Sequence, residues 1–125
     1  GQTNATAAAL ALLTMAGGPE PDEAADAGRF LRSMQTPSGG LLAHAAAPEP
    51  DLLSTFTGLV AAPDPTVFDL SGVARFARSL ALPGGGFRGA PRDGGADIEY
   101  TYYGIACLAL LRAHLDQRST RGDPA

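Results

Sequence analysis

The sequence has no lysine and no tryptophan, and Cys107 is the only cysteine among its 125 residues. A single cysteine cannot form an internal disulfide, and it excludes a zinc site built from four cysteines. The nine basic residues are therefore all arginine and thirteen residues are acidic, which gives a net charge of −4. This charge provides no basic surface for a nucleic acid, so we expect no nucleic-acid partner.

Long apolar runs are also missing. The longest stretches, near Ala7–Leu13 and Ile105–Leu111, are far shorter than the roughly 18 residues that a membrane-spanning helix needs. No basic segment precedes an apolar stretch in the way of a signal peptide, and we expect a cytoplasmic protein. The use of arginine alone, with abundant alanine, glycine and proline, is typical of a GC-rich bacterial coding bias.

What the chain does contain is small apolar residues. Apolar residues make up 45% of the sequence, which excludes a disordered chain, but only 6% of it is aromatic. No stretch alternates apolar and polar residues as a half-buried strand does, whereas apolar residues recur at helical spacing between glycine and proline signals. We predict an all-α domain over residues 2–117 and a flexible tail over 118–125. The expected helices cover 5–15, 21–34, a segment opening at Pro50-Asp51, one opening at Asp64-Pro65, and 97–116.

An internal repeat of 46–47 residues organises these helices. Asn4, Asp51 and Asp97 each precede a helical stretch, and we expect them to be N-caps. A threonine, an aromatic residue and a glycine follow both aspartates at the same offsets: Thr55, Phe56 and Gly58 in one copy, and Thr101, Tyr102 and Gly104 in the other. The unit is a helical hairpin followed by a glycine-rich loop, and about two and a half units are present. Such hairpins need stacked neighbours to bury their apolar faces.

The glycine-rich loops repeat at the same spacing. The first loop follows the helical segment that ends near Met34 and reads Gln35-Thr-Pro-Ser-Gly39-Gly40-Leu41. The second follows the segment that ends near Leu80 and reads Ala81-Leu-Pro-Gly-Gly85-Gly86-Phe87. These loops, with the helix that begins at Asp97, resemble the repeat of protein prenyltransferase beta subunits and squalene cyclases. The resemblance implies an α/α toroid of about six helical hairpins, of which this chain supplies a part. It also implies structural roles for eight residues, namely Gln35, Gly39, Gly40, Gly85, Gly86, Phe87, Asp51 and Asp97.

A partial toroid leaves three arrangements open. The chain is part of a longer protein, or the repeats form an open arc, or chains associate to cover the open edges. Exposed apolar edges favour contact, so we expect either self-association or contact with missing repeats.

The resemblance implies a zinc site in the prenyltransferases, made by an aspartate, a cysteine two residues later and a distant histidine. These positions fall here on Asp51, Leu53 and Tyr100, and leucine cannot bind a metal. The cyclases use an Asp-rich acidic motif, which the sequence lacks. We therefore expect no metal and no cofactor, disfavour zinc-dependent prenylation, and leave open whether the chain is an enzyme.

Other side chains have two interpretations each. His44 and His114 are either surface or capping residues or replacements for the missing zinc ligands. Cys107 is either a small core residue or a nucleophile. Arg88 and Arg92 are exposed loop charges or the binding site of a prenyl diphosphate. Tyr100 and Tyr102 belong to the core or to an aromatic wall for an isoprenoid chain.

Two functions follow from these observations. The chain is a prenyltransferase- or terpene-cyclase-like repeat domain that binds an isoprenoid or lipid in an apolar cavity. Alternatively, it is a non-catalytic helical-repeat module for interaction, or a fragment of a larger protein. The resemblance supports the first, and the missing ligand residues favour the second.

Overall fold

A computed structural model describes residues 1–122 of the chain, and these residues form an all-α structure, as the sequence predicts. It contains five helices and one short 3-10 turn, and no strand occurs among residues 1–122. Proline, glycine and aspartate residues separate the helices. The elements are α1 (Thr3–Met15), α2 (Pro21–Ser33), α3 (Leu52–Ala61), η1 (Pro65–Val67), α4 (Leu70–Ser79) and α5 (Ile98–Arg121).

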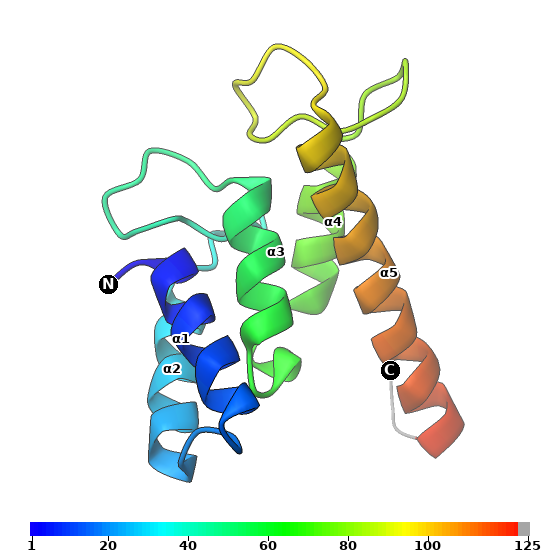
Figure 1. Cartoon of the computed structure of the whole chain (residues 1–125). Coiled ribbons are helices and arrows are strands. Elements are labelled where there is room, and N and C mark those ends of the chain that lie inside the picture. The colour runs from blue at the N-terminus through cyan, green and yellow to red at the C-terminus, as the bar shows by residue number, and fades with distance from the viewer. Residues whose placement is uncertain (123–125) are drawn as a thin grey trace.

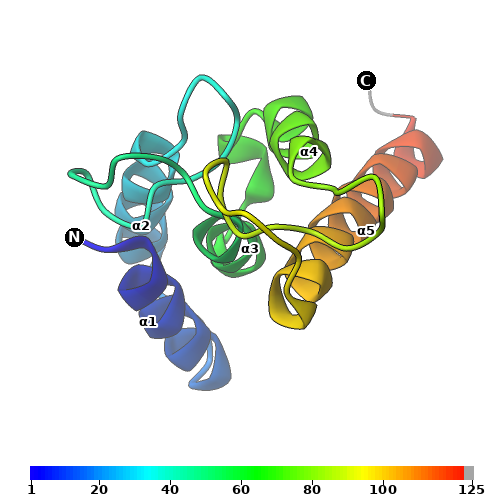
Figure 2. The same ribbon diagram turned by 90° about the horizontal axis from the view of Figure 1, so that it is seen from above.

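The helices lie in two layers (Figures 1 and 2). The inner layer holds α1, α3 and α5, with α3 in the middle, and the outer layer holds α2 and α4. In Figure 2, α1 and the start of α5 both lie lower in the picture than α3, on the side away from the outer helices α2 and α4. The inner layer is therefore bent, and its concave face is turned away from α2 and α4. A closed toroid of six hairpins stays a prediction.

The first glycine-rich loop connects two inner helices. The backbone N–H of Leu41 donates to Thr55 Oγ1 of α3 at 2.9 Å, and this hydroxyl donates to the carbonyl of Asp51 at 2.7 Å. On the other side of the loop, the N–H of Thr3 in α1 donates to the carbonyl of Ala43 at 2.8 Å. Because Leu41 and Thr55 are fully buried, an N–H without this partner would carry its full desolvation cost.

The second loop repeats these bonds. Phe87 N–H donates to Thr101 Oγ1 at 3.0 Å, and the threonine hydroxyl donates to the carbonyl of Asp97 at 2.8 Å. The N–H of Leu52 in α3 donates to the carbonyl of Gly89 at 2.7 Å. Each loop thus holds the inner helix of its own hairpin and the inner helix that follows, which is the physical meaning of the repeat in the sequence.

Gln35 ties the first loop to the outer helix that follows. Its Nε2 donates to the carbonyl of Asp69 at 3.0 Å, and its Oε1 accepts from the N–H of Asp69 at 2.9 Å. Asp69 caps α4 by accepting from the N–H of Gly72, and this bond lowers the pKa of the Asp69 carboxyl. In the second loop the equivalent position is Ala81, which has no side-chain amide to form these two hydrogen bonds.

Gly39 and Gly85 occupy equivalent turns but have different surroundings. Both have left-handed backbone conformations, with φ of +99° and +100°, which glycine adopts without steric cost. A Cβ on Gly39 would lie 1.9 Å from the carbonyl oxygen of Gly72 in α4, whereas a Cβ on Gly85 would meet no atom within 4 Å. The first loop is thus packed against an outer helix and the second is open.

The core lies between the two layers. Leu31 of α2, Leu52 of α3 and Val73 of α4 have no exposed surface, and Leu41 and Leu80 bring the loop ends into the same cluster. Phe87 is the second loop's counterpart of Leu41 and lies over Gly104, where an added Cβ would be 2.3 Å from the ring. Apolar loop residues therefore complete a core that the small helical residues leave thin.

Three expected boundaries are wrong. Gln2, not Asn4, occupies the N-cap position of α1, so the first cap spacing is 49 residues and not 47. Asp64 caps only η1, and α4 begins at Leu70 after its own cap Asp69. The turn that Asp64 caps ends at Val67, and Asp69, a second capping residue, begins α4.

The third correction concerns the C-terminal boundary. Helix α5 continues to Arg121, whereas the sequence predicts its end near residue 116. The helix ends at Gly122, whose φ of 73° is the left-handed conformation common after a helix. The flexible tail expected over 118–125 stays a prediction. The remaining part of the expected tail, 123–125, lies outside the described residues.

We predict that Gly39→Ala destabilises the protein much more than Gly85→Ala. Both substitutions force alanine into a left-handed conformation, which costs about 1–2 kcal/mol, but only Gly39→Ala adds a clash with the backbone of α4. We expect a loss of about 3 kcal/mol or more for Gly39→Ala in the free energy of unfolding, measured by urea denaturation. Equal losses would contradict the packing of the first loop on α4.

Candidate functional site

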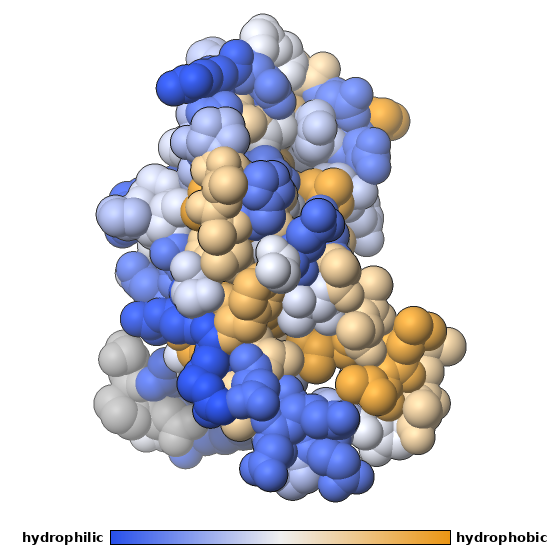
Figure 3. Space-filling model, turned by 90° about the vertical axis from the view of Figure 1, so that its left-hand side faces the viewer, coloured by the Kyte–Doolittle hydropathy of each residue, from blue (hydrophilic) through white to orange (hydrophobic). Residues whose placement is uncertain are grey.

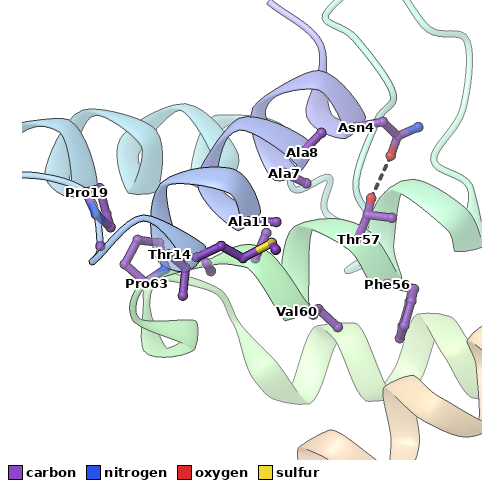
Figure 4. A pocket seen from close by; sticks show the side chains of 14 residues that line it. Asn4, Ala7, Ala8, Ala11, Thr14, Pro19, Phe56, Thr57, Val60 and Pro63 are labelled. Carbon is purple, nitrogen blue, oxygen red and sulfur yellow. Dashed lines mark hydrogen bonds between the residues drawn. The ribbon is translucent and has the colours of Figure 1, made fainter.

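A hollow lies between α1 and α3. It is a groove of about 840 Å³ whose walls are mostly apolar, and Figure 4 shows it from close by. Helix α1 forms one wall and α3 the other, and the turns that follow the two helices, with Pro19 and Pro63, lie at the end shown at the left of Figure 4. The lining residues are Asn4, Ala7, Ala8, Ala11, Thr14, Met15, Gly18, Pro19, Phe56, Thr57, Val60, Ala61, Ala62 and Pro63.

Small side chains on α1 create the groove. Ala7, Ala8 and Ala11 lie on the face of α1 that is turned toward α3, and alanine fills little of the space between two helices. On the opposite wall Val60 is 55% exposed, so a large aliphatic side chain lies open in the groove. Open apolar surface of this kind is typical of a binding site for an apolar ligand.

One polar pair lies in the groove wall. Thr57 Oγ1 donates to Asn4 Oδ1 at 2.6 Å, which joins α3 to the first turn of α1 (Figure 4). The same hydroxyl lies 3.3 Å from the carbonyl of Ser54. Asn4, expected as a helix cap, is therefore a cross-link between inner helices at the upper end of the groove.

An aromatic cluster extends from the groove to α5. Phe56 lines the groove and stacks on Tyr103 with ring centroids 5.1 Å apart, and it meets the edge of Tyr102 at 5.8 Å. Of the two tyrosines expected at the site, Tyr102 is thus next to a groove residue and 62% exposed. Tyr100 is half-buried against Gly89 in the second loop and does not line the groove.

The two candidate arginines lie in the second loop and not in the groove. Arg92 is exposed, and its Nε is 3.6 Å from a carboxylate oxygen of Glu49 in the first loop. Arg88 is half-buried, and its buried Nε makes no hydrogen bond within residues 1–122. Neither side chain is among those that line the groove, so the groove wall carries no basic group.

The histidines are far from one another in the sequence and occupy different elements. His44 is exposed in the first loop. His114 is not near a helix end, because α5 continues for seven residues to Arg121; it is half-buried and lines a smaller apolar pocket of about 280 Å³. Among the described residues, no three His, Cys, Asp or Glu side chains are grouped so as to hold a metal ion.

The remaining positions of the implied zinc site are structural here. Asp51 caps α3, with one carboxylate oxygen accepting from Ser54 N–H at 2.7 Å and the other from Ser54 Oγ at 2.8 Å. Leu53 is half-buried in the first turn of the same helix. Asp97 caps α5 by accepting from Glu99 N–H at 2.7 Å. These aspartates therefore use their oxygens to begin helices.

Sequence reasoning missed the groove residues on α1 and α3. Asn4, Ala8, Ala11 and Met15 follow one another at helical spacing, so their common face could be found from the sequence. Which neighbour that face meets depends on how α1 packs against α3, and one sequence carries no direct signal for this. Within residues 1–122, none of the helices combines the length and apolar character needed to cross a membrane.

Cys107 is buried in the core and provides a test of the fold. Its side chain has no exposed surface, and burial raises the pKa of the thiol from 9.0 to about 12. The unfolded chain loses the proton above about pH 9 while the folded chain keeps it, so stability falls as the pH rises from about 9 toward 12.

We predict that iodoacetamide does not label Cys107 in the folded protein at about pH 8, because only the thiolate reacts. Labelling should follow unfolding in urea, and mass spectrometry of quenched samples measures both. Rapid labelling without urea would contradict the buried position.

Comparison of the chain with models of known protein families and with curated proteins finds no match. The resemblance to the prenyltransferase and cyclase repeat therefore rests on the loop and helix residues themselves.

Proposed function

We propose that this chain is a helical-repeat domain that binds an isoprenoid or a similar apolar lipid chain in the groove between α1 and α3. The observation that carries the proposal is the groove itself: about 840 Å³ with walls of alanine, Val60 and Phe56. Burial of a flexible hydrocarbon chain against such walls gains about 25 cal/mol for each Å² of apolar surface removed from water.

The resemblance of the loops supports this choice of ligand. In prenyltransferase and cyclase repeats the inner helices line the cavity for the isoprenoid, and here α1 and α3 of the inner layer line the groove. The proposal covers binding and no chemical step. The positions that the resemblance assigns to a cysteine and a histidine ligand hold Leu53 and Tyr100.

We predict that Ala11→Phe weakens the binding of farnesol about tenfold or more, because the larger ring fills the groove and displaces ligand surface. Ala109→Phe on the exposed face of α5 is the matched control, since Ala109 is exposed and lines no described pocket. Displacement of a fluorescent fatty acid measures both affinities. Equal affinities for the two variants, or no binding by the parent chain, would contradict the proposal.

We also predict that farnesol binds at least as tightly as farnesyl diphosphate, because no basic side chain lines the groove. A diphosphate would lose hydration there without gaining a charged partner. The double variant Arg88→Ala/Arg92→Ala should leave both affinities unchanged. A preference for the diphosphate that this variant abolishes would instead assign the headgroup to the second loop.

A second candidate function is favoured by exposed apolar residues on α1 and α5, the helices at the two ends of the inner layer. Leu12 and Leu13 of α1, which do not line the groove, are 67% and 36% exposed, and Ile98 and Ile105 of α5 are 90% and 57% exposed. We propose that the chain acts as an interaction module through these faces, by self-association or by contact with further repeats. Sedimentation of the purified chain tests the first of these.

A further inference from the structure

The groove between α1 and α3 has two unlike ends. Asn4 and Thr57 lie together at one end, and Thr14 lies at the other, near Pro19 (Figure 4). Every other residue that lines the groove is apolar or a glycine. In a mostly apolar binding site the few polar groups fix the orientation of the ligand. The hydrogen-bonding groups left unused at each end therefore decide how a ligand lies.

The Asn4–Thr57 pair has such unused groups. The Thr57 hydroxyl donates its proton to Asn4 Oδ1 at 2.6 Å, so its oxygen is still able to accept a hydrogen bond. The Asn4 amide nitrogen is a donor that makes no hydrogen bond within residues 1–122, and Figure 4 shows it turned away from Thr57. Both side chains are half-buried. The pair thus presents a free donor and a free acceptor side by side.

The opposite end of the groove has no free donor among the described residues that line it. The Thr14 hydroxyl donates to the carbonyl of Leu10 in its own helix at 2.9 Å. Pro19 and Pro63 have no N–H, and the N–H of Gly18 already donates to a backbone carbonyl of α1. A polar head group therefore finds a donor only at the Asn4 end.

The C-terminal end of α1 is also its more apolar end. Leu12, Leu13 and Met15, the exposed large apolar residues of this helix, all lie in its last turn, and Met15 lines the groove. Figure 3 shows apolar surface at the lower right of the face on which α1 and α2 lie. The groove thus runs from a polar end at Asn4 to an apolar end at Met15.

We propose that the groove selects a lipid alcohol, which is a hydrocarbon chain that ends in a hydroxyl group, and binds it with the hydroxyl at Asn4 and Thr57. The hydroxyl oxygen accepts from the Asn4 amide nitrogen, and the hydroxyl proton is donated to Thr57 Oγ1. The chain extends along Ala8 and Ala11 toward Met15. The inference rests on the proposed lipid-binding function and names the chemical class and the orientation of the ligand.

A hydroxyl is the head group that uses both members of the pair. A plain hydrocarbon leaves the donor and the acceptor without partners in a site partly shielded from water. A methyl ether accepts from Asn4 but has no proton for Thr57, and a carboxylate brings a charge to a wall without a basic side chain. In a purely apolar groove the ether would bind more tightly than the alcohol, because a hydroxyl is more costly to remove from water. The order of these two affinities therefore tests the proposal.

The test compares farnesol with farnesyl methyl ether by equilibrium dialysis against the purified chain. We expect farnesol to bind about fivefold more tightly than the ether. Asn4→Leu and Thr57→Val keep roughly the size of each side chain and remove its polar atoms, so each should abolish this preference. Thr14→Val is the matched control, since it removes a hydroxyl at the other end of the same groove and should leave the preference unchanged. A poorly folded variant would lose both ligands alike, so the ratio of the two affinities separates recognition from stability.

The outcomes distinguish this inference from the function on which it rests. Binding of neither ligand would overturn the proposed function, and this inference with it. Binding of both, with the ether as tight as farnesol or tighter, would leave the groove as a lipid site and overturn the selection of an alcohol. A preference for farnesol that survives in Asn4→Leu or Thr57→Val, or that is lost in Thr14→Val, would overturn the place assigned to the hydroxyl.

A second measurement tests the orientation without comparing affinities. The rise of α1 from Asn4 to Met15 is about 16 Å, which is close to the length of an extended farnesyl chain. A farnesol analogue with a photoreactive diazirine at the end away from the hydroxyl is bound and irradiated, and mass spectrometry of peptides locates the label. We expect labels on residues 14–19 and 60–63. Labels confined to residues 4–8 would reverse the ligand and overturn the proposal.

Discussion

The structure depends on one hydrogen bond that occurs twice, from the backbone N–H of a loop to a threonine hydroxyl in the next inner helix. The loops turn sharply at glycines and bury Leu41 or Phe87 at the end of the turn. A buried N–H needs a partner, and Thr55 and Thr101 supply it at 2.9 and 3.0 Å. Because each threonine also donates to the residue that caps its helix, the loop, the cap and the helix start are positioned together. This bond therefore fixes where each loop meets the inner helix that follows it.

Small side chains have two effects in this chain. At Gly58 and Gly104 they allow a loop residue to reach the helix surface, and the core is completed there. At Ala8 and Ala11 no loop residue arrives, so the same smallness leaves the groove beside α3. The composition that makes the core thin thus also makes the concave face hollow. Which outcome holds at a given alanine or glycine is decided by the neighbouring element and not by the residue.

The sequence was sufficient for those features that depend on local signals. Asp51 and Asp97 could be identified as caps, and the shared spacing of Thr55 and Thr101 revealed the repeat, because such signals act over a few residues. The cap of α1 was misplaced because Asn4 is a good capping residue, whereas its amide oxygen is used instead by Thr57, more than fifty residues away. The cap of α4 is mispredicted for a related reason: Asp64 is also a capping residue but caps only the short turn η1, whereas Asp69 caps α4. The groove depends on the distance between α1 and α3, which no local pattern contains.

The bonds between each loop and the inner helix that follows it contain no charged group. Thr3, Thr55 and Thr101 use hydroxyls and backbone groups, whereas the ion pair between Arg92 and Glu49, which joins the two loops, involves an exposed arginine. Dissolved salt screens charges but has little effect on buried neutral hydrogen bonds. The threonine bonds that join each loop to the next inner helix are therefore nearly independent of ionic strength, and concentrated salt weakens only the exposed charged contact between the two loops.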